Sequence, residues 1–185
     1  MIAYKFLKSG AKGLVSGFRW PTPDVGSPGE WVHATSPIRE CEAGIHVCRA
    51  MDLPYWMCDE LWAIEIDGDV VEGTDMLIAS RGRLLRLFSG WTRAGQTRFV
   101  EACRDRAARI LDEVPVERRQ HADAFMGHMD TYLRLESTQL GALCTALAIA
   151  STCGGPNDTG AVKSAYRNER AWQSRWLVDN LGLAL

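Results

Sequence analysis

Two histidines, a tyrosine and a glutamate recur at helical spacing in the C-terminal half of the chain. At about 100° per residue, His121, His128, Tyr132 and Glu136 fall within one narrow stripe of a helix, and Phe125 lies in the same stripe. Imidazole exchanges protons near neutral pH, and positioned phenol and carboxyl groups donate or accept protons. The stripe predicts acid–base chemistry in a pocket wall. The wet edge of an amphipathic helix is the alternative.

A second group of potential ligands lies in the N-terminal half. Cys41, His46, Cys48 and Cys58 supply three thiols and an imidazole, a donor set that suits a tetrahedral zinc site. Their spacing, Cys-x4-His-x-Cys-x9-Cys, matches no common zinc knuckle, and small thiols on a buried strand are commonly packing residues. We therefore assign no metal, keep these four residues as the candidates for one, and count His46 among the candidate catalytic residues.

Aromatic residues provide the candidate walls of a pocket. Three of the seven tryptophans, Trp20, Trp31 and Trp56, adjoin predicted loops, and Tyr55 stands beside Trp56. Such side chains fill cores or line ligand pockets. We predict that Tyr55, Trp56, Trp20, Trp31 and Phe125 bind the substrate, with core filling as the alternative.

The elements that must hold these residues differ between the two halves of the chain. Gly and Pro divide the N-terminal half into short extended pieces, and Asp67-Gly68 predicts a hairpin turn. The spacing indicates a twisted, mostly antiparallel sheet or a partial barrel. The predicted strands cover residues 4–7, 16–20, 31–33, 44–48, 61–66, 70–71, 76–79 and 83–88, with a short helical turn over 52–56.

After Trp91 the apolar period changes from two to about 3.6. Pro115 ends the first predicted helix, and Gly182 terminates the last. Gly127 lies inside a predicted helix, where it costs about 1 kcal/mol relative to Ala, which suggests close packing. The predicted helices cover residues 99–114, 117–135 and 159–181, and residues 140–151 either continue the second helix or form a separate one after a break near Ser137-Thr138.

These patterns define an α+β fold. Residues 1–90 form a strand-rich subdomain, and residues 91–185 form a helical subdomain of three to four helices that packs on it to give one globular unit. We expect the pocket to lie between the sheet and the helices.

Composition limits the partners. The chain has 185 residues, of which 46% are hydrophobic and 24% charged, with a formal net charge of -2, so nothing attracts it globally to nucleic acid or to an anionic membrane. The N-terminal residues do not resemble a signal peptide, and no apolar run is long enough to span a bilayer. We expect a cytoplasmic protein with reduced cysteines.

The block that begins Cys41-x-x-Gly44-Ile45-His46-x-Cys48 and continues through Tyr55 to a strand ending at Gly68 resembles an uncharacterised bacterial domain. The resemblance covers residues 1–90 and implies no known activity. The block is also similar, more distantly, to the ADP-ribosyltransferase catalytic fold. That similarity implies that Gly44, Ile45, His46 and Tyr55 flank the nicotinamide of NAD, although the first strand offers Lys5 where that fold has His or Arg.

Together these features predict a small-molecule enzyme that uses side-chain acid–base chemistry without a cofactor, such as a lyase, isomerase or cyclase. A protein-binding or scaffold module and an NAD-dependent transferase are the alternatives. The expected partner is a small-molecule substrate, with no nucleic acid and no membrane. A homodimer formed through the helices is an assembly that this architecture permits.

Overall fold

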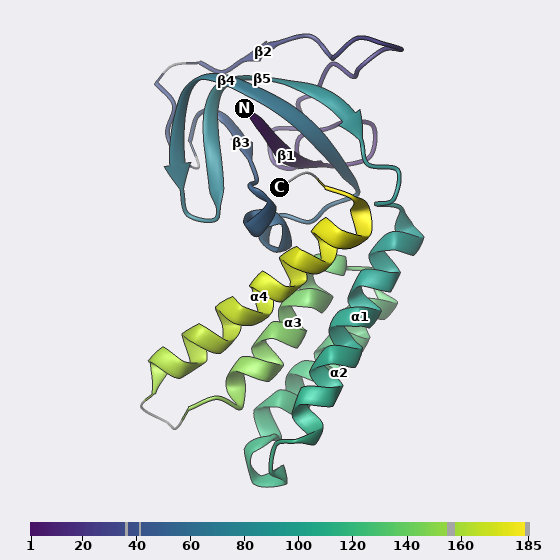
Figure 1. The fold of residues 1–185 in the computed structure, drawn as a ribbon, viewed down its shortest axis with the longest axis vertical. Coiled ribbons are helices and arrows are strands. Elements are labelled where there is room, and N and C mark those ends of the chain that lie inside the picture. The colour runs from purple at the N-terminus through teal and green to yellow at the C-terminus, as the bar shows by residue number, and fades with distance from the viewer. Residues whose placement is uncertain (36, 41, 155–157, 184–185) are drawn as a thin grey trace. The chain divides into compact units, whose positions relative to one another are not determined.

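The structure is a computed structural model, and it describes residues 1–35, 37–40, 42–154 and 158–183. The chain divides into two compact units, Met1–Thr92 with Asn180–Leu185, and Arg93–Asp179. The first holds an antiparallel sheet and the second is helical, which confirms the α+β class (Figure 1). The packing of the helices on the sheet stays a prediction.

The sheet is built around two long paired strands, β4 and β5. Its order is β1-β4-β5-β2, and β3 also pairs with β5. Beyond the end of β3, Cys48 and Tyr4 exchange two backbone hydrogen bonds of 2.9 and 2.7 Å, which join this segment to β1. The strands are β1 (Ile2–Leu7), β2 (Val32–His33), β3 (Ile45–Val47), β4 (Glu60–Gly73) and β5 (Met76–Leu87).

The hairpin turn lies seven residues beyond its predicted place, a shift from Asp67-Gly68 to Thr74-Asp75. The register of β4 against β5 shifts between Asp67 and Val70, so Gly68, with φ +78°, belongs to a bulge inside a continuous strand. Asp75, with φ +55°, turns the chain instead. The prediction failed because a left-handed glycine serves a bulge as well as a turn.

Residues 16–20 do not form the predicted strand. Gly17 has φ +66°, and the amide of Gly13 donates to the carbonyl of Phe18 at 2.8 Å, so the segment folds back on itself as a loop. Trp20 leaves this loop and is buried.

One apolar core cluster of the sheet unit lies on a single face of the strands, while Phe6, Leu61 and Ile78, at alternate positions, are also buried. In β1, Ala3 and Leu7 belong to this core, with Trp20 and Trp62 beside them. Lys5 occupies the position between Ala3 and Leu7 with the same side-chain direction, because side chains alternate along a strand. The other members of this core are Ala11, Ile45, Val47, Ile64, Ile66, Leu77, Ala79 and Leu84.

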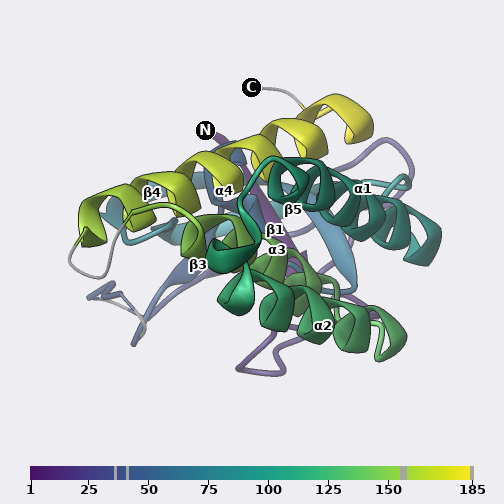
Figure 2. The ribbon, with the colours of Figure 1, turned by 90° about the horizontal axis from the view of Figure 1, so that it is seen from below.

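The second unit consists of helices that end where the sequence predicts. Pro115 follows α1, and Gly182, with φ +60°, follows α4. In both views, α4 runs beside α1 and α3 (Figures 1 and 2), and Gln173 of α4 donates to the carbonyl of Ala142 in α3 at 2.9 Å. The helices are η1 (Ala50–Tyr55) in the sheet unit, then α1 (Arg93–Asp112), η2 (Val116–Arg118), α2 (Gln120–Arg134), α3 (Thr138–Ser151) and α4 (Thr159–Leu181). No helix within the described ranges is long and apolar enough to cross a membrane.

The surroundings of Gly127 in α2 are open. A Cβ atom at this position meets no atom within 4 Å, so the expected close packing is wrong. We predict that Gly127→Ala raises the free energy of unfolding by about 0.5–1 kcal/mol, because alanine loses less backbone entropy in a helix. Urea denaturation measures the change.

The matched control is Gly141→Ala in α3. Its Cβ would lie 3.0 Å from Cγ1 of Val100, so the helix-propensity gain is offset by crowding. An equal gain at both positions would contradict this account.

Candidate functional site

A cavity of about 300 Å³ opens in the sheet unit beside the start of β4. This volume is at the lower end of the range for small-molecule pockets. Two indole rings and three polar or charged side chains meet there, so the cavity offers both flat apolar walls and polar contacts. Its lining residues are Gly10, Ala11, Arg19, Trp20, Thr22, Glu60 and Trp62.

Glu60 fixes one wall of this cavity. Gly10 and Ala11 follow β1 in left-handed conformations, with φ +78° and +54°, which point both amides at the carboxylate. The amides donate to Glu60 at 2.8 and 3.1 Å, and Nε1 of Trp62 donates to it at 2.9 Å. A non-glycine residue such as Ala11 in this conformation is strained, and backbone strain of this kind concentrates at functional sites. Glu60 thus orients Trp62 and the loop after β1.

Arg19 supplies a positive charge at the cavity. It is exposed, and its guanidinium makes no hydrogen bond or ion pair with any residue that the structure describes. Trp20, the next residue, is only 6% exposed and carries Phe18 edge-on against its ring at 5.8 Å. An available guanidinium beside a fixed indole suits a ligand with an anionic group and a flat apolar part.

Lys5 lies directly behind this wall. Its Nζ is 4.9 Å from the ring centre of Trp20 and donates to the carbonyl of His46 at 2.7 Å. In the register of β1 against β4, Lys5 is opposite Trp62. Burial among these groups lowers the pKa of Lys5 to about 8, only partly opposed by its attraction to Cys48.

Of the predicted catalytic residues, His46 contacts this site through its backbone. Its side chain is partly buried, and burial together with the nearby Lys5 ammonium lowers the pKa of the imidazole. The neutral ring is therefore favoured at physiological pH.

The structure separates the predicted helical stripe into two groups. His121 and His128 are exposed, and Phe125 packs partly buried against Leu111, Ala122 and Ala148. The other two members, Tyr132 and Glu136, line a small hollow of about 140 Å³ in the helical unit. Its remaining lining residues are Arg93, Gln96, Thr97, Val100, Leu133, Ser137 and Thr138.

Glu136 in this hollow already has partners. Its carboxylate pairs with Arg93, which also donates to its carbonyl at 2.9 Å. Glu136 has φ +58°, and the amide of Ser137 donates to the carbonyl of Tyr132 at 2.9 Å, so Glu136 closes α2 as a left-handed cap.

Among the predicted aromatic binding residues, Trp20 lines the cavity. Trp31 packs instead against Arg81 and Arg83, whose guanidinium carbons lie 4.5 and 4.6 Å from its ring centre. Trp56 donates to the carbonyl of Asp75 at 2.7 Å, and Tyr55 ends η1. Trp31 and Trp56 thus contact other parts of the sheet unit, and none of these three residues is among those that line the cavity.

Of the four candidate metal ligands, the three that the structure describes, His46, Cys48 and Cys58, do not form a recognisable metal site. Cys41 lies outside the described residues. Burial raises the pKa values of Cys48 and Cys58, which disfavours thiolates. Within residues 1–35, 37–40, 42–154 and 158–183, no three His, Cys, Asp or Glu side chains gather closely enough to hold a metal ion.

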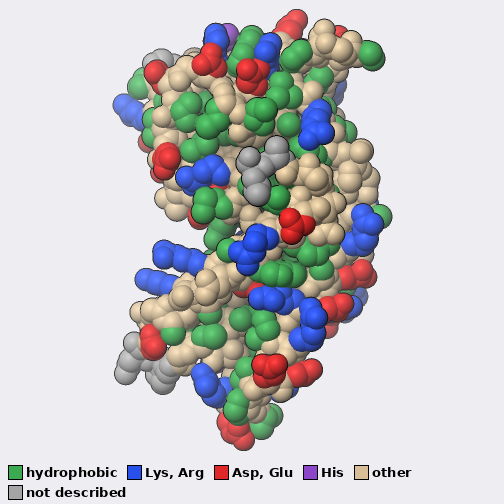
Figure 3. All heavy atoms as spheres, viewed as in Figure 1, with side chains coloured by type: hydrophobic (Ala, Val, Ile, Leu, Met, Phe, Trp, Pro, Cys, Tyr) green, Lys and Arg blue, Asp and Glu red, His purple; other side chains and the backbone are tan. Residues whose placement is uncertain are grey.

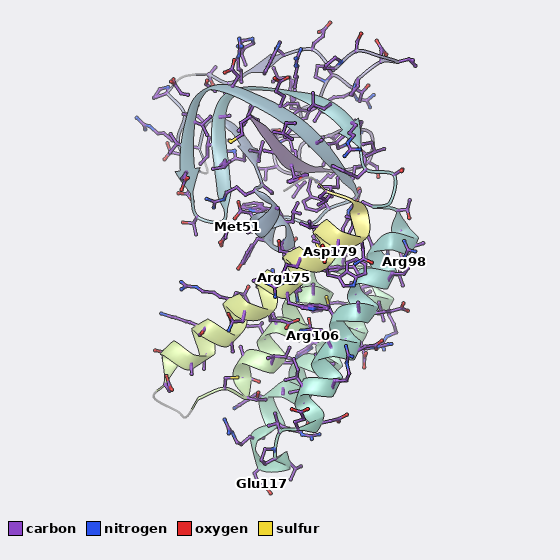
Figure 4. The ribbon with its side chains drawn as sticks, viewed as in Figure 1. Met51, Arg98, Arg106, Glu117, Arg175 and Asp179 are labelled. Carbon is purple, nitrogen blue, oxygen red and sulfur yellow. The ribbon has the colours of Figure 1, made fainter. Side chains whose placement is uncertain are left out.

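The helical unit contains a buried ion pair. Glu169 is 2% exposed, and Arg106 donates to it at 2.9 Å while stacking on Trp172 at 4.7 Å (Figure 4). Burial raises the pKa of Glu169 although Arg106 opposes the change. On the face drawn in Figure 3, basic and acidic side chains are intermingled. We interpret the pair as an internal link between α1 and α4.

Sequence reasoning missed Lys5, Arg19, Glu60 and Trp62 as site residues. One signal was present, since alternation along residues 2–7 places Lys5 on the same side as Ala3 and Leu7. A lysine at a core-facing strand position is unusual. Nothing in the sequence brings residues 10–11 and 19–20 next to Glu60.

Comparison with known proteins finds no matching family model, no similar curated protein and no similar solved structure. The resemblances to an uncharacterised bacterial domain and to ADP-ribosyltransferases therefore rest on the sequence motif alone.

The pKa of Lys5 predicts a pH dependence of stability. Folding lowers this pKa from 10.5 to about 8, so between these values the unfolded chain holds a proton that folded Lys5 has lost. Stability from this group therefore rises with pH in that window. We expect the free energy of unfolding of the wild type to increase relative to Lys5→Met between pH 7.5 and 10. Comparison of the two proteins cancels the titration of shared groups that do not interact with Lys5.

Urea denaturation across this pH range provides the measurement. Lys12→Met removes an exposed lysine from the same unit. Its free energy of unfolding should differ from that of the wild type by an amount that does not change with pH. If the free energy of unfolding of the wild type rises equally relative to both variants, or does not rise relative to Lys5→Met, then burial does not lower the pKa of Lys5.

The conformation of Glu136 predicts opposite effects of two substitutions. Both substitutions remove the ion pair between Glu136 and Arg93. The two side chains are exposed, so the pair contributes only about 0–1 kcal/mol to the stability of the fold. Glu136→Gly also relieves the strain of φ +58°, whereas Glu136→Ala keeps it. We expect Glu136→Gly to be at least as stable as the wild type and Glu136→Ala to be less stable, as judged by thermal unfolding. The reverse order would mean that the ion pair, and not the cap, determines stability here.

Proposed function

We propose that this protein is a small-molecule enzyme whose substrate site is the cavity of the sheet unit. The substrate class is a small organic anion with a flat apolar body. The observation that carries the proposal is the guanidinium of Arg19, which no described residue pairs with, beside the indoles of Trp20 and Trp62 in a cavity of about 300 Å³.

Each part of the substrate has a complementary side chain. A carboxylate accepts hydrogen bonds from Arg19, because a planar guanidinium matches it in a bidentate geometry. A flat ring packs on Trp20 and Trp62, whose orientations are fixed by neighbouring contacts. Glu60 has its oxygens occupied by three donors, so it shapes the wall.

Lys5 is the residue that we assign to proton transfer. General acid–base catalysis is most efficient when the pKa of the group lies near the working pH. The pKa of Lys5, about 8, meets this condition. This assignment keeps the acid–base chemistry predicted from the sequence and moves it from the histidine stripe to β1.

A protein-binding role is the second candidate, and the loops of the sheet unit favour it. Val15 and Val25 are fully exposed, and Phe18 is 46% exposed, so apolar groups face outward in the segment between β1 and β2. A protein that co-purifies with the chain and is released by Val15→Ser or Val25→Ser would support this role.

Binding of 4-methylbenzoate tests the proposed substrate class. This probe has a flat ring and a carboxylate but no reactive group. We expect it to quench tryptophan fluorescence and to raise the melting temperature of the protein. Arg19→Gln should weaken binding about tenfold to a hundredfold, since a hydrogen bond to a charged group contributes about 1.5–3 kcal/mol.

Two controls separate the cavity from general charge effects. The neutral 4-methylbenzamide should bind much more weakly than the carboxylate. Arg39→Gln, which removes an exposed arginine from the same unit, should leave binding unchanged. Equal binding by the wild type and Arg19→Gln would exclude this site, and stabilisation by NAD alone would favour the transferase alternative.

A further inference from the structure

Lys5 differs from the other lysines of the chain. There are four, and the remaining three, Lys8, Lys12 and Lys163, are exposed. Lys5 is partly buried in the middle of β1, with its stem directed to the same side as the apolar core that contains Ala3 and Leu7. A lysine in such a place normally pairs with a carboxylate.

The ammonium of Lys5 has no such partner in the part of the chain that the structure describes. No carboxylate oxygen there lies within 4.0 Å of Nζ. Its contacts are instead the carbonyl of His46 at 2.7 Å and the ring of Trp20 at 4.9 Å. A carbonyl and an indole compensate a buried positive charge less fully than a carboxylate does, and both also tolerate the neutral amine. The geometry therefore makes the uncharged, nucleophilic amine more accessible at Lys5 than at an exposed lysine.

The two indoles connect this nitrogen to the cavity. Trp20 contacts Lys5 and lines the cavity, and Trp62 lines the cavity from the strand position opposite Lys5. A flat ligand held by Arg19 and packed on Trp20 would contact the same indole ring that Nζ of Lys5 faces. Lys5 is not among the residues that line the cavity, so a side-chain rotation of Lys5 or Trp20 is required to bring the amine to the ligand.

We propose that Lys5 forms a reversible imine with an aldehyde or ketone group of the ligand, so that the substrates are small carbonyl compounds that carry an anionic group and a flat apolar part. This inference rests on the proposed function of the cavity and names its substrate class.

The chemical step is balanced without a further reactant. The lone pair of neutral Nζ attacks the carbonyl carbon, the C=O π bond opens, and a proton passes from nitrogen to oxygen to give a carbinolamine. The C–O bond then breaks as the nitrogen lone pair forms the C=N bond, and the leaving hydroxyl takes the second proton of the nitrogen and departs as water, so that a neutral imine remains. At pH 7 an amine with a pKa of about 8 is about 10% neutral, against less than about 0.1% at the ordinary pKa of 10.5.

Reductive trapping tests the inference. The full-length protein is incubated at pH 7 with 4-carboxybenzaldehyde, reduced with cyanoborohydride, digested and mapped by mass spectrometry. Fragment spectra distinguish Lys5 from the α-amine of Met1, which precedes it by four residues. We expect Lys5 to be labelled at least about tenfold faster than Lys8, Lys12 or Lys163.

Three comparisons make the outcome decisive. Lys5→Met should lose the dominant adduct, whereas Lys8→Met and Lys12→Met should keep it. If Lys5→Met does not fold, competition in the wild type serves instead, because 4-methylbenzoate should protect Lys5 and leave the exposed lysines unprotected. Arg19→Gln should slow labelling of Lys5 without changing that of Lys163.

The failure of this inference differs from the failure of the proposed function. If 4-methylbenzoate binds in an Arg19-dependent manner but Lys5 is labelled no faster than the exposed lysines, the imine is excluded and the cavity stands as a binding site. If 4-methylbenzoate does not bind, the proposed function is excluded, and labelling of Lys5 that this anion cannot suppress marks a reactive amine without a ligand site.

Discussion

The pairing of β4 with β5 holds the sheet unit together, because every other strand attaches to one of these two. β1 pairs with β4, and β2 and β3 both pair with β5. The two long strands stay in one ladder through the shift at Asp67–Val70 and turn at Asp75. Slippage by one residue would move Ile64 and Ile66 from the core to the opposite face. The core and the cavity therefore both depend on this register.

The candidate site results from the way one carboxylate satisfies backbone groups. Glu60, at the first position of β4, accepts hydrogen bonds from the strained loop after β1 and from Trp62. Because its oxygens are engaged, Arg19 at the same cavity stays available to a ligand. Lys5 behind Trp20 is likewise left without a carboxylate among the described residues. One acidic residue used for structure thus leaves two basic residues without an acidic partner in the part of the chain that the structure describes.

The helical unit uses its polar residues differently. Gln173 bridges α4 to α3, and Arg106 bridges α1 to Glu169 of α4. Such buried pairs add little net stability over apolar packing, but leaving one partner alone is costly, so they favour one register of the helices over others. The exposed His121 and His128 take no part in these links. Their helical spacing indicates the solvent-exposed face of α2.

Sequence alone determined the α+β class, the strand character of residues 4–7, 45–47 and 61–66, and the ends of α1 and α4, because these follow from local periodicity and from Pro and Gly. It did not distinguish a bulge from a turn at Gly68, since both need the same left-handed backbone. Trp20 was predicted as a pocket residue from its type. Its meeting with Lys5, Arg19 and Glu60 was decided by tertiary structure, because residues 5, 19–20 and 60 become neighbours only when β1 pairs with β4 and the loop after β1 folds onto Glu60.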